Sequence, residues 1–316
     1  MNESVFITGI EGFVGSHLAR YLFDNGYQVS GLRMAEPVAD LSFARVHIGD
    51  VRDCAAVQAL LASAAPDFII HLAAISSVRI AEQDPGRAVQ VNVLGTTQLL
   101  EAVRIAAPAA RVLVVSSSDV YNSLAGKDGR FDEDAAVRPM NVYALTKLCA
   151  ENVGRYYVDR HGLNVVILRP FSHTGPGQST DFVFPSVARQ IAQAEAGQRA
   201  PEIEVGNTDV SRDYTDIRDV CRAYRLALTG GVKGDIFNIT SEQLLRIGDG
   251  IDYLVSLAKV PIAVRVGAGR VRREKTVLAG SSARFRAATG WQPEIDVRQT
   301  LRDVLEYERG RVNAAR

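Results

Sequence analysis

The chain has 316 residues, of which 47% are hydrophobic, and its 36 Lys and Arg residues balance 36 Asp and Glu residues. This length predicts a large core divided between two lobes. The balanced charge gives no basis for binding nucleic acid or an anionic membrane. No apolar run is long enough to span a bilayer. The three cysteines lie in no metal-binding spacing, so we expect no metal site, no disulfide framework and a reducing cytoplasmic location.

The first predicted elements form a nucleotide-binding turn. An apolar strand at residues 5–7 leads into Gly9, Gly12 and Gly15, and a helix over residues 16–22 follows. This spacing allows a tight turn, a close approach to a pyrophosphate and close packing of helix on strand. The helix N-terminus offers free N–H groups to phosphate. We expect the cofactor to contact this turn at Gly9, Gly12, Phe13, Val14 and Gly15.

The second and third strands bear on which coenzyme is bound. After the second strand, residues 28–32, Arg33 stands near the position where an NAD-selective site has an acidic residue. An arginine there suits a 2′-phosphate, so we favour NADPH and leave NADH open. Asp50 and Val51 follow the third strand, and the carboxylate of Asp50 is placed to accept from the adenine amino group.

The fourth strand, residues 68–71, runs into small side chains against which a cofactor can lie. The helix predicted next, residues 89–106, contains Asn92, which needs hydrogen-bond partners if it is buried. It is either a structural residue or a brace for the active-site loop. The cofactor-site candidates in this part of the chain are Leu72, Ala73, Ala74 and Asn92.

Three polar side chains predict proton transfer. A strand over residues 112–115 leads to Ser117, and Tyr143 and Lys147 lie four residues apart on a predicted helix over residues 143–157, on one face. A lysine cation beside a phenol favours the phenolate, which predicts a lowered pKa for Tyr143. The serine hydroxyl can hold a substrate oxygen. The trio is typical of carbonyl and alcohol chemistry.

The order of elements predicts the fold class. Strands alternate with helices to about residue 170, which indicates a Rossmann-type, doubly wound parallel sheet. Helices over residues 183–197, 216–228 and 297–309 and a strand at 236–239 follow. We predict a dinucleotide-binding domain of residues 1–170 plus 213–240. Residues 171–212 plus 241–316 would form a smaller mixed α/β lobe.

As a set, several segments resemble the extended short-chain dehydrogenase/reductases, which act on nucleotide sugars. Within that family, residues 169–178, 182–192 and 205–216 look like the GDP-4-dehydro-6-deoxy-D-mannose reductases, which reduce a C4 ketone and form GDP-D-rhamnose. The resemblance implies a GDP-sugar substrate and, from the fold, a homodimer formed by the two helices over residues 89–106 and 143–157. The segments that carry the wider resemblance are residues 8–15, 50, 71–74, 116–121, 143–147 and 169–171.

The resemblance also implies roles for single residues. Ser117, Tyr143 and Lys147 match the catalytic trio of the family, and Tyr143 and Lys147 also contact the cofactor. Pro170 and Phe171 match the segment that passes the nicotinamide. Arg212 matches an arginine that faces the diphosphate of the substrate, and Arg273 is a second candidate for that role. The residues expected to contact the substrate are therefore Ser117, Ser172, Arg212 and Arg273.

Two departures from the pattern concern the substrate. Ser172 stands where the segment usually has Asn, and Asn122 replaces the usual Gly after Val120-Tyr121. Asp119 occupies a position where nucleotide-sugar 4,6-dehydratases tend to carry Glu, so a dehydratase stays open, as does a 4-epimerase. A non-catalytic nucleotide sensor is the alternative from another class, although such proteins usually lose the Tyr or the Lys.

Overall fold

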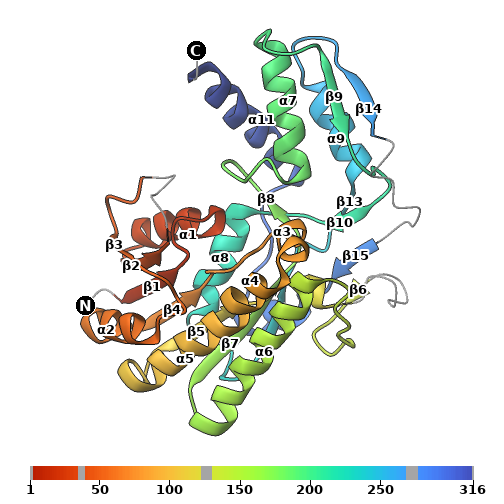
Figure 1. Cartoon of the computed structure of the whole chain (residues 1–316). Helices are drawn as coiled ribbons and strands as arrows, with labels where there is room; N and C mark the ends of the chain where they lie inside the picture. The colour runs from red at the N-terminus through yellow and green to blue at the C-terminus, as the bar shows by residue number, and fades with distance from the viewer. Residues whose placement is uncertain (1–2, 35–39, 122–129, 268–276, 315–316) are drawn as a thin grey trace.

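The computed structural model describes residues 3–34, 40–121, 130–267 and 277–314. At its centre is a seven-stranded parallel sheet in the order β3-β2-β1-β4-β5-β7-β12, which is the predicted Rossmann-type fold (Figure 1). The strand order reverses between β1 and β4, the place where open α/β sheets bind ligands. The strands are β1 (Ser4–Thr8), β2 (Gln28–Arg33), β3 (Arg45–Ile48), β4 (Phe68–His71), β5 (Arg111–Val115), β7 (Asn164–Pro170) and β12 (Ile236–Ile239).

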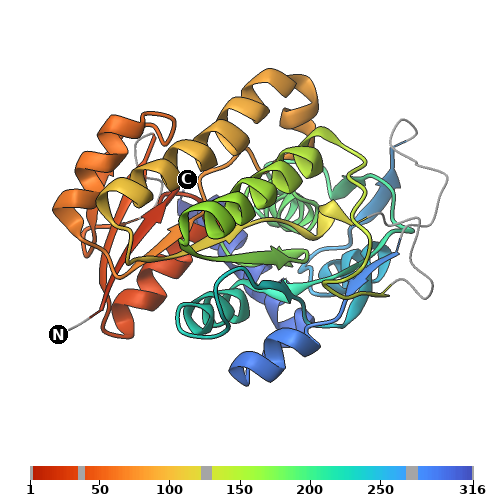
Figure 2. The same cartoon turned by 90° about the horizontal axis from the view of Figure 1, so that it is seen from below.

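Helices cover both faces of this sheet because its strands are apolar on both sides. One face is packed by α2 (Cys54–Ala64), α5 (Gly95–Ala106) and α6 (Val142–His161). The two longer helices, α5 and α6, lie side by side on the outside of the molecule (Figure 2). The opposite face is packed by α1 (Phe13–Asp24), α8 (Ile217–Ala227) and α10 (Ala283–Thr289).

The helix predicted over residues 89–106 is longer and less regular in the structure. It begins with α4 (Pro85–Val89), continues through a π-helical turn, η1 (Gln90–Leu94), and ends as α5. A π turn widens the helix and is common at functional sites. Here it carries Asn92, whose side chain is buried.

The remaining elements form a smaller unit above the sheet in Figure 1, with its own apolar core. The chain enters it after β7, returns to the main sheet for α8 and β12, leaves again, and returns once more for α10 before it ends with α11. The predicted boundaries of the two lobes stay a prediction. The smaller unit consists of α7 (Val183–Glu195), β9 (Glu202–Val205), β10 (Ser211–Asp213), β13 (Leu244–Arg246), α9 (Ile247–Ser256), β14 (Ala263–Val266), β15 (Val277–Gly280) and α11 (Val297–Ala314).

Short elements connect the two units. The strands β8 (His173–Thr174) and β11 (Thr215–Asp216) pair with each other in parallel. The others are α3 (Val78–Gln83), the 3₁₀ helix η2 (Ser118–Val120) and β6 (Arg130–Phe131). Within the described ranges, no helix combines the length and the apolar character that a bilayer crossing needs.

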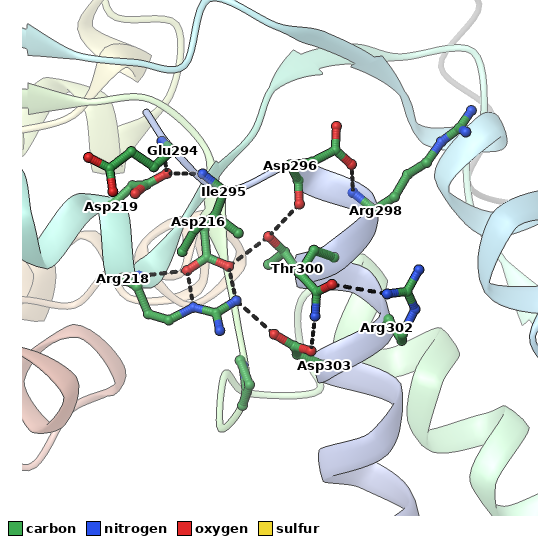
Figure 3. A network of polar contacts seen from close by, with 12 residues as sticks. Asp216, Arg218, Asp219, Glu294, Ile295, Asp296, Arg298, Thr300, Arg302 and Asp303 are labelled. Carbon is green, nitrogen blue, oxygen red and sulfur yellow. Dashed lines mark hydrogen bonds and ion pairs between the residues drawn. The ribbon is translucent and has the colours of Figure 1, made fainter. Parts of the chain in front are cut away.

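A polar network centred on Asp216 joins the start of α8 to the start of α11 (Figure 3). The Asp216 carboxylate is buried and accepts from the Arg218 backbone N–H at 2.7 Å, from its guanidinium at 2.8 Å and from the Thr300 hydroxyl at 2.7 Å. Arg218 also bonds Asp303 on α11 at 2.7 Å. Burial raises the pKa of Asp216, but these hydrogen bonds outweigh it and leave that pKa below its ordinary value. The network therefore fixes β11, and with it β8, against the C-terminal helix.

Replacing this carboxylate should destabilise the fold. We expect Asp216→Asn to lower the free energy of unfolding near pH 7 by about 1.5–3 kcal/mol, the range for hydrogen bonds to a charged group. Because the pKa of Asp216 is lowered on folding, the wild type holds this advantage above the unfolded-state pKa and loses it as the pH falls through the folded-state pKa. Urea denaturation at several pH values measures both effects.

Asp249→Asn is the matched control, because it removes a carboxylate from the exposed ion pair with Arg246. An exposed surface pair contributes little, and Arg246 keeps its second partner, Asp209, so the unfolding curve of this variant should stay near that of the wild type. Equal losses in the two variants would contradict the role given to Asp216.

Candidate active site

A cavity of about 840 Å³ opens at the carboxyl edge of the sheet, between the glycine turn after β1 and the start of α7. Most of the site residues predicted from the sequence line this cavity, although they come from segments spread over more than half of the chain. The predicted residues that line it are Gly9, Gly12, Phe13, Val14, Gly15, Arg33, Val51, Leu72, Ala73, Ala74, Ser117, Tyr143, Lys147, Pro170, Phe171 and Ser172.

The glycine turn is shaped to hold a phosphate. Gly9 has φ +72°, and a Cβ there would lie 2.9 Å from the Ala73 nitrogen. A Cβ on Gly15 would overlap the carbonyl oxygen of Gly9. The helix α1 begins after Gly12 with no side-chain cap, and the first N–H groups of a helix have no partner within it. The turn is therefore a cradle that side chains would fill and that suits the pyrophosphate of a dinucleotide.

The predicted trio comes together in the cavity wall. Ser117 precedes η2, and its hydroxyl accepts from the Asp119 N–H at 3.1 Å. Tyr143 lines the same cavity, and the Ser117 side chain acts to lower its pKa. Lys147, one turn further along α6, is buried and donates from Nζ to the Val115 carbonyl at 2.7 Å. The segment after strand β5 thus carries Ser117, and helix α6 carries Tyr143 and Lys147.

The direction of the Tyr143 pKa shift is opposite to the sequence-based expectation. Burial raises this pKa, and the nearby Asp119 carboxyl raises it further, against a smaller lowering by the Ser117 hydrogen bond. The Lys147 ammonium instead bonds a backbone carbonyl, and burial lowers its pKa to about 8, partly offset by Glu151. Tyr143 is therefore a neutral phenol near pH 7, which suits a proton donor.

A buried ion pair behind the trio holds its elements together. Arg169 on β7 donates to both oxygens of Glu151 on α6, at 2.9 and 2.7 Å, and both side chains are almost completely inaccessible to solvent. The Ser116 hydroxyl donates to Glu151 at 2.5 Å, and Arg169 also bonds the Tyr121 hydroxyl at 2.8 Å. The pair therefore ties the residue before Ser117 to the helix that carries Tyr143.

Asn92 braces the loop of residues 72–79, which lines the cavity. Its side chain accepts from the Ile75 N–H at 2.8 Å and donates to the Ile75 carbonyl at 3.1 Å and to the Thr146 hydroxyl at 2.9 Å. Residues 72–79 line the cavity, whereas Asn92 does not. Of the two roles left open for this residue, the geometry favours the brace.

The buried side chain of His71 also supports the loop of residues 72–79. Its two ring nitrogens face the hydroxyls of Thr8, at 2.8 Å, and Thr96, at 3.0 Å. Burial, with a further effect of the Lys147 charge, lowers its pKa to about 3. It is therefore a neutral histidine bridging β1, β4 and α5.

Besides Asn92, three predicted site residues lie outside the cavity lining or outside the described ranges. Asp50 is held by Arg52, at 2.9 and 2.5 Å, and that hydrogen bonding lowers the pKa of Asp50. Arg212 on β10 does not line the cavity, but its charge acts on two lining residues, Asp119 and Tyr214. Arg273 falls outside the described residues, as does Asn122.

The sequence analysis gave no role to several lining residues. Arg79 on α3 pairs with Asp181 at 3.1 Å, between the sheet unit and the loop before α7. No spacing or motif marks either residue. Tyr214 and His173 stand inside segments that carry the resemblance, which is the signal that could have found them. Within the described ranges, no group of three or more His, Cys, Asp or Glu residues is arranged to hold a metal.

Breaking the buried ion pair should be costly, and removing both partners much less so. We expect Glu151→Gln to lower the free energy of unfolding by about 3–5 kcal/mol, because it leaves the Arg169 cation buried without its counter-charge. In the double variant Glu151→Met, Arg169→Met no buried charge remains, so most of that loss should be recovered. Chemical denaturation of the three proteins gives the comparison. A double variant less stable than the single one would contradict this account.

The chain was compared with known proteins. The family model described as GDP-mannose 4,6 dehydratase matches residues 6–304. The chain is 37% identical over 315 residues to the GDP-6-deoxy-D-mannose reductase of Pseudomonas aeruginosa, with 99% of both chains covered. It also resembles the solved structure of RMD from Pseudomonas aeruginosa complexed with NADPH, at 36% identity and a TM-score of 0.88, over 98% of this chain and 100% of that one. MoeE5 in complex with UDP-glucuronic acid and NAD matches at 28% identity and a TM-score of 0.85, over 98% and 99%.

Proposed function

The chain belongs to the GDP-mannose 4,6-dehydratase family of extended short-chain dehydrogenase/reductases, and on that premise we propose that it reduces the C4 ketone of GDP-4-dehydro-6-deoxy-D-mannose to GDP-D-rhamnose with NADPH. One observation carries the proposal. Ser117, Tyr143 and Lys147 line the same cavity as the glycine turn of Gly9, Gly12 and Gly15. The full-length likeness to a GDP-6-deoxy-D-mannose reductase supports the choice of substrate.

The cofactor residues follow from the cavity lining. The turn from Gly9 to Gly15 would hold the pyrophosphate on the N–H groups of α1. Arg33 would face a 2′-phosphate, which supports NADPH, as does the NADPH bound to the similar solved structure. NADH stays possible, since another similar structure holds NAD. Pro170 and Phe171 would border the nicotinamide, and Asp50 would contact the adenine end.

The protein groups supply the proton and hold the carbonyl. Bound NADPH supplies a hydride to the ketone carbon. Tyr143 donates its proton to the ketone oxygen, and Ser117 hydrogen-bonds that oxygen as negative charge develops on it. Such general acid help is worth roughly 10²- to 10⁴-fold. Lys147 would hold the ribose of the cofactor and tune Tyr143.

Substrate contacts extend toward the smaller unit. Ser172 lines the cavity beside Phe171 and would contact the sugar. Arg212, on β10, would bind the diphosphate, for which a guanidinium offers charge-assisted, bidentate hydrogen bonds. Arg273 is proposed as a second group for the same diphosphate. These contacts lie away from the reacting carbon and supply binding energy that positions it.

A 4,6-dehydratase is the second candidate, because Asp119 lines the cavity next to Ser117. That reaction needs an additional acid and an additional base near C5 and C6 of the sugar. Asp119 is one acidic group in the wall of the same cavity. The neighbouring Ser118 supplies no second one. Reduction, in contrast, needs only the proton donor that Tyr143 provides.

Incubating the protein with NADPH and the 4-keto-6-deoxy GDP-sugar should oxidise the coenzyme in proportion to the sugar added. Absorbance of the reduced nicotinamide measures this, with NADH in a parallel reaction. Tyr143→Phe should lose turnover by roughly 10²-fold or more, because it removes the proton donor, and should still bind NADPH. No oxidation of either coenzyme by the wild type would remove the reductase assignment.

We also propose a homodimer, from apolar side chains on the outer surface of α4, η1, α5 and α6. Two adjacent helices with such a surface can pair with a second copy across a two-fold axis as a four-helix bundle. Figure 2 shows α5 and α6 side by side on the outside of the molecule. The exposed apolar residues are Val89, Leu94, Ile105, Leu145 and Tyr156.

The three free cysteines support a reducing, cytoplasmic location as part of the same proposal.

Charges on this surface should separate the two copies. We expect the wild type to sediment as a dimer and the variant Leu94→Glu, Ile105→Glu to sediment as a monomer, because pairing would bury two unpaired carboxylates in each chain. Val232→Glu is the control, since Val232 is also exposed but precedes β12, outside these helices. A monomeric wild type, or dissociation by the control as well, would reject the proposed interface.

A further inference from the structure

An ion pair between the two units lies at the mouth of the cavity. The guanidinium of Arg79, on α3, donates to the Asp181 carboxylate at 3.1 Å, and both residues line the cavity. The side chain of Arg79 is 61% exposed and that of Asp181 is 49% exposed. Residues that line a cavity and are also exposed to this degree lie at its edge. The pair therefore joins α3 to the loop before α7 at the entrance of the cavity.

We propose that the Arg79–Asp181 pair is a closing contact of the cavity, which opens to admit the dinucleotide and slows its release while it is closed. The proposal adds two residues to the site, and it concerns exchange of the ligand, not the chemical step. A ligand held in an enclosed cavity needs an opening step before it can leave, and such steps set many turnover rates. The role of the pair does not depend on which sugar is reduced.

On the side of the sheet unit, α3 is a fixed anchor. Glu82, three residues after Arg79 on α3, accepts from the Val142 backbone N–H at 2.8 Å, where α6 begins. The chain that leads into α3 is held at Ile75, whose N–H and carbonyl both bond the Asn92 side chain. The arginine therefore extends from an element that is tied to both α6 and η1.

On the side of the smaller unit, the chain is fixed before and after Asp181. The Gln178 side chain accepts from the Thr174 hydroxyl at 2.8 Å and donates to the His173 carbonyl at 3.1 Å. Helix α7, which follows, packs in the apolar core of the smaller unit. The segment between these two points is residues 179–182. Because it is so short and lies at the surface, it can shift and break the ion pair without unfolding either unit.

The exposure of the pair determines how strongly it can hold the cavity closed. An exposed ion pair contributes little to stability, which corresponds to roughly a two- to fivefold change in an equilibrium constant. This is enough to slow release, and weak enough to be broken at each exchange of ligand. The buried pair of Glu151 with Arg169 is unsuited to such a task, because separating it would leave two desolvated charges without partners.

The test measures release of NADPH from the complete protein, from the change in nicotinamide fluorescence after mixing with excess NADP⁺. Arg79→Ala and Asp181→Asn should each raise the dissociation rate by about two- to fivefold, because each removes one charge of the pair. The exchange Arg79→Asp, Asp181→Arg restores opposite charges, so its rate should return to near that of the wild type. Arg265→Ala is the matched control. It removes an exposed ion pair with Glu202, outside the cavity lining, and should leave the rate unchanged.

Ionic strength gives a second measurement on the same proteins. In about 1 M salt, where charges are screened beyond roughly 3 Å, the ratio of each single variant's dissociation rate to that of the wild type should fall toward one. Equal rates for the wild type and both single variants at low salt would overturn the proposal, as would an exchanged pair as fast as the single variants.

Faster release from Arg79→Ala alone would make Arg79 a direct contact of the dinucleotide and would also overturn the closing pair. Because no sugar is present, these outcomes are separate from those that test the reaction. A wild type that fails to oxidise NADPH with the GDP-sugar, but whose release rates follow the charges of the pair, would reject only the proposed function.

Discussion

The structure depends on one buried ion pair, between Arg169 on β7 and Glu151 on α6. Two charges removed from water are tolerated only when each satisfies the other and their remaining hydrogen-bonding groups find partners. Here the bidentate contact is completed by the Ser116 and Tyr121 hydroxyls. Because these partners lie on separate elements, satisfying the charges sets the relative positions of the end of β5, helix α6 and strand β7. The proposed catalytic residues Ser117, Tyr143 and Lys147 lie next to these elements.

The cavity lies between the sheet unit and the smaller unit, which are separated there but joined by short elements. The sheet unit contributes the glycine turn and the trio, and the smaller unit contributes the wall near Phe184 and Tyr214. The junction is made by β8 and β11, which pair in parallel, and by the Asp216 network that secures β11 to α11 (Figure 3). A nucleotide sugar spanning both units would therefore find its carbonyl end and its diphosphate end placed by different parts of the chain.

The electrostatics of the site suit donation of a proton more than its removal. Burial and Asp119 keep the phenol neutral, and burial also makes Lys147 easier to deprotonate than a lysine in water. Both effects come from enclosing the groups in the cavity wall, not from their spacing along α6. The four-residue interval between Tyr143 and Lys147 places them on one side of the helix, but the partner of the ammonium is a carbonyl on β5.

By itself, the sequence predicted the sheet, the glycine turn and the three side chains Ser117, Tyr143 and Lys147 that line one cavity, because these predictions follow from local patterns: strand and helix periodicity, glycine spacing and a four-residue interval. Only the tertiary structure decided which charges meet. The pairing of Glu151 with Arg169 and the brace from Asn92 to Ile75 join residues that share no local pattern. Their distances, and the desolvation that sets the pKa values, arise when distant segments pack together, and so the direction of the Tyr143 shift could not be obtained from the Tyr–Lys spacing.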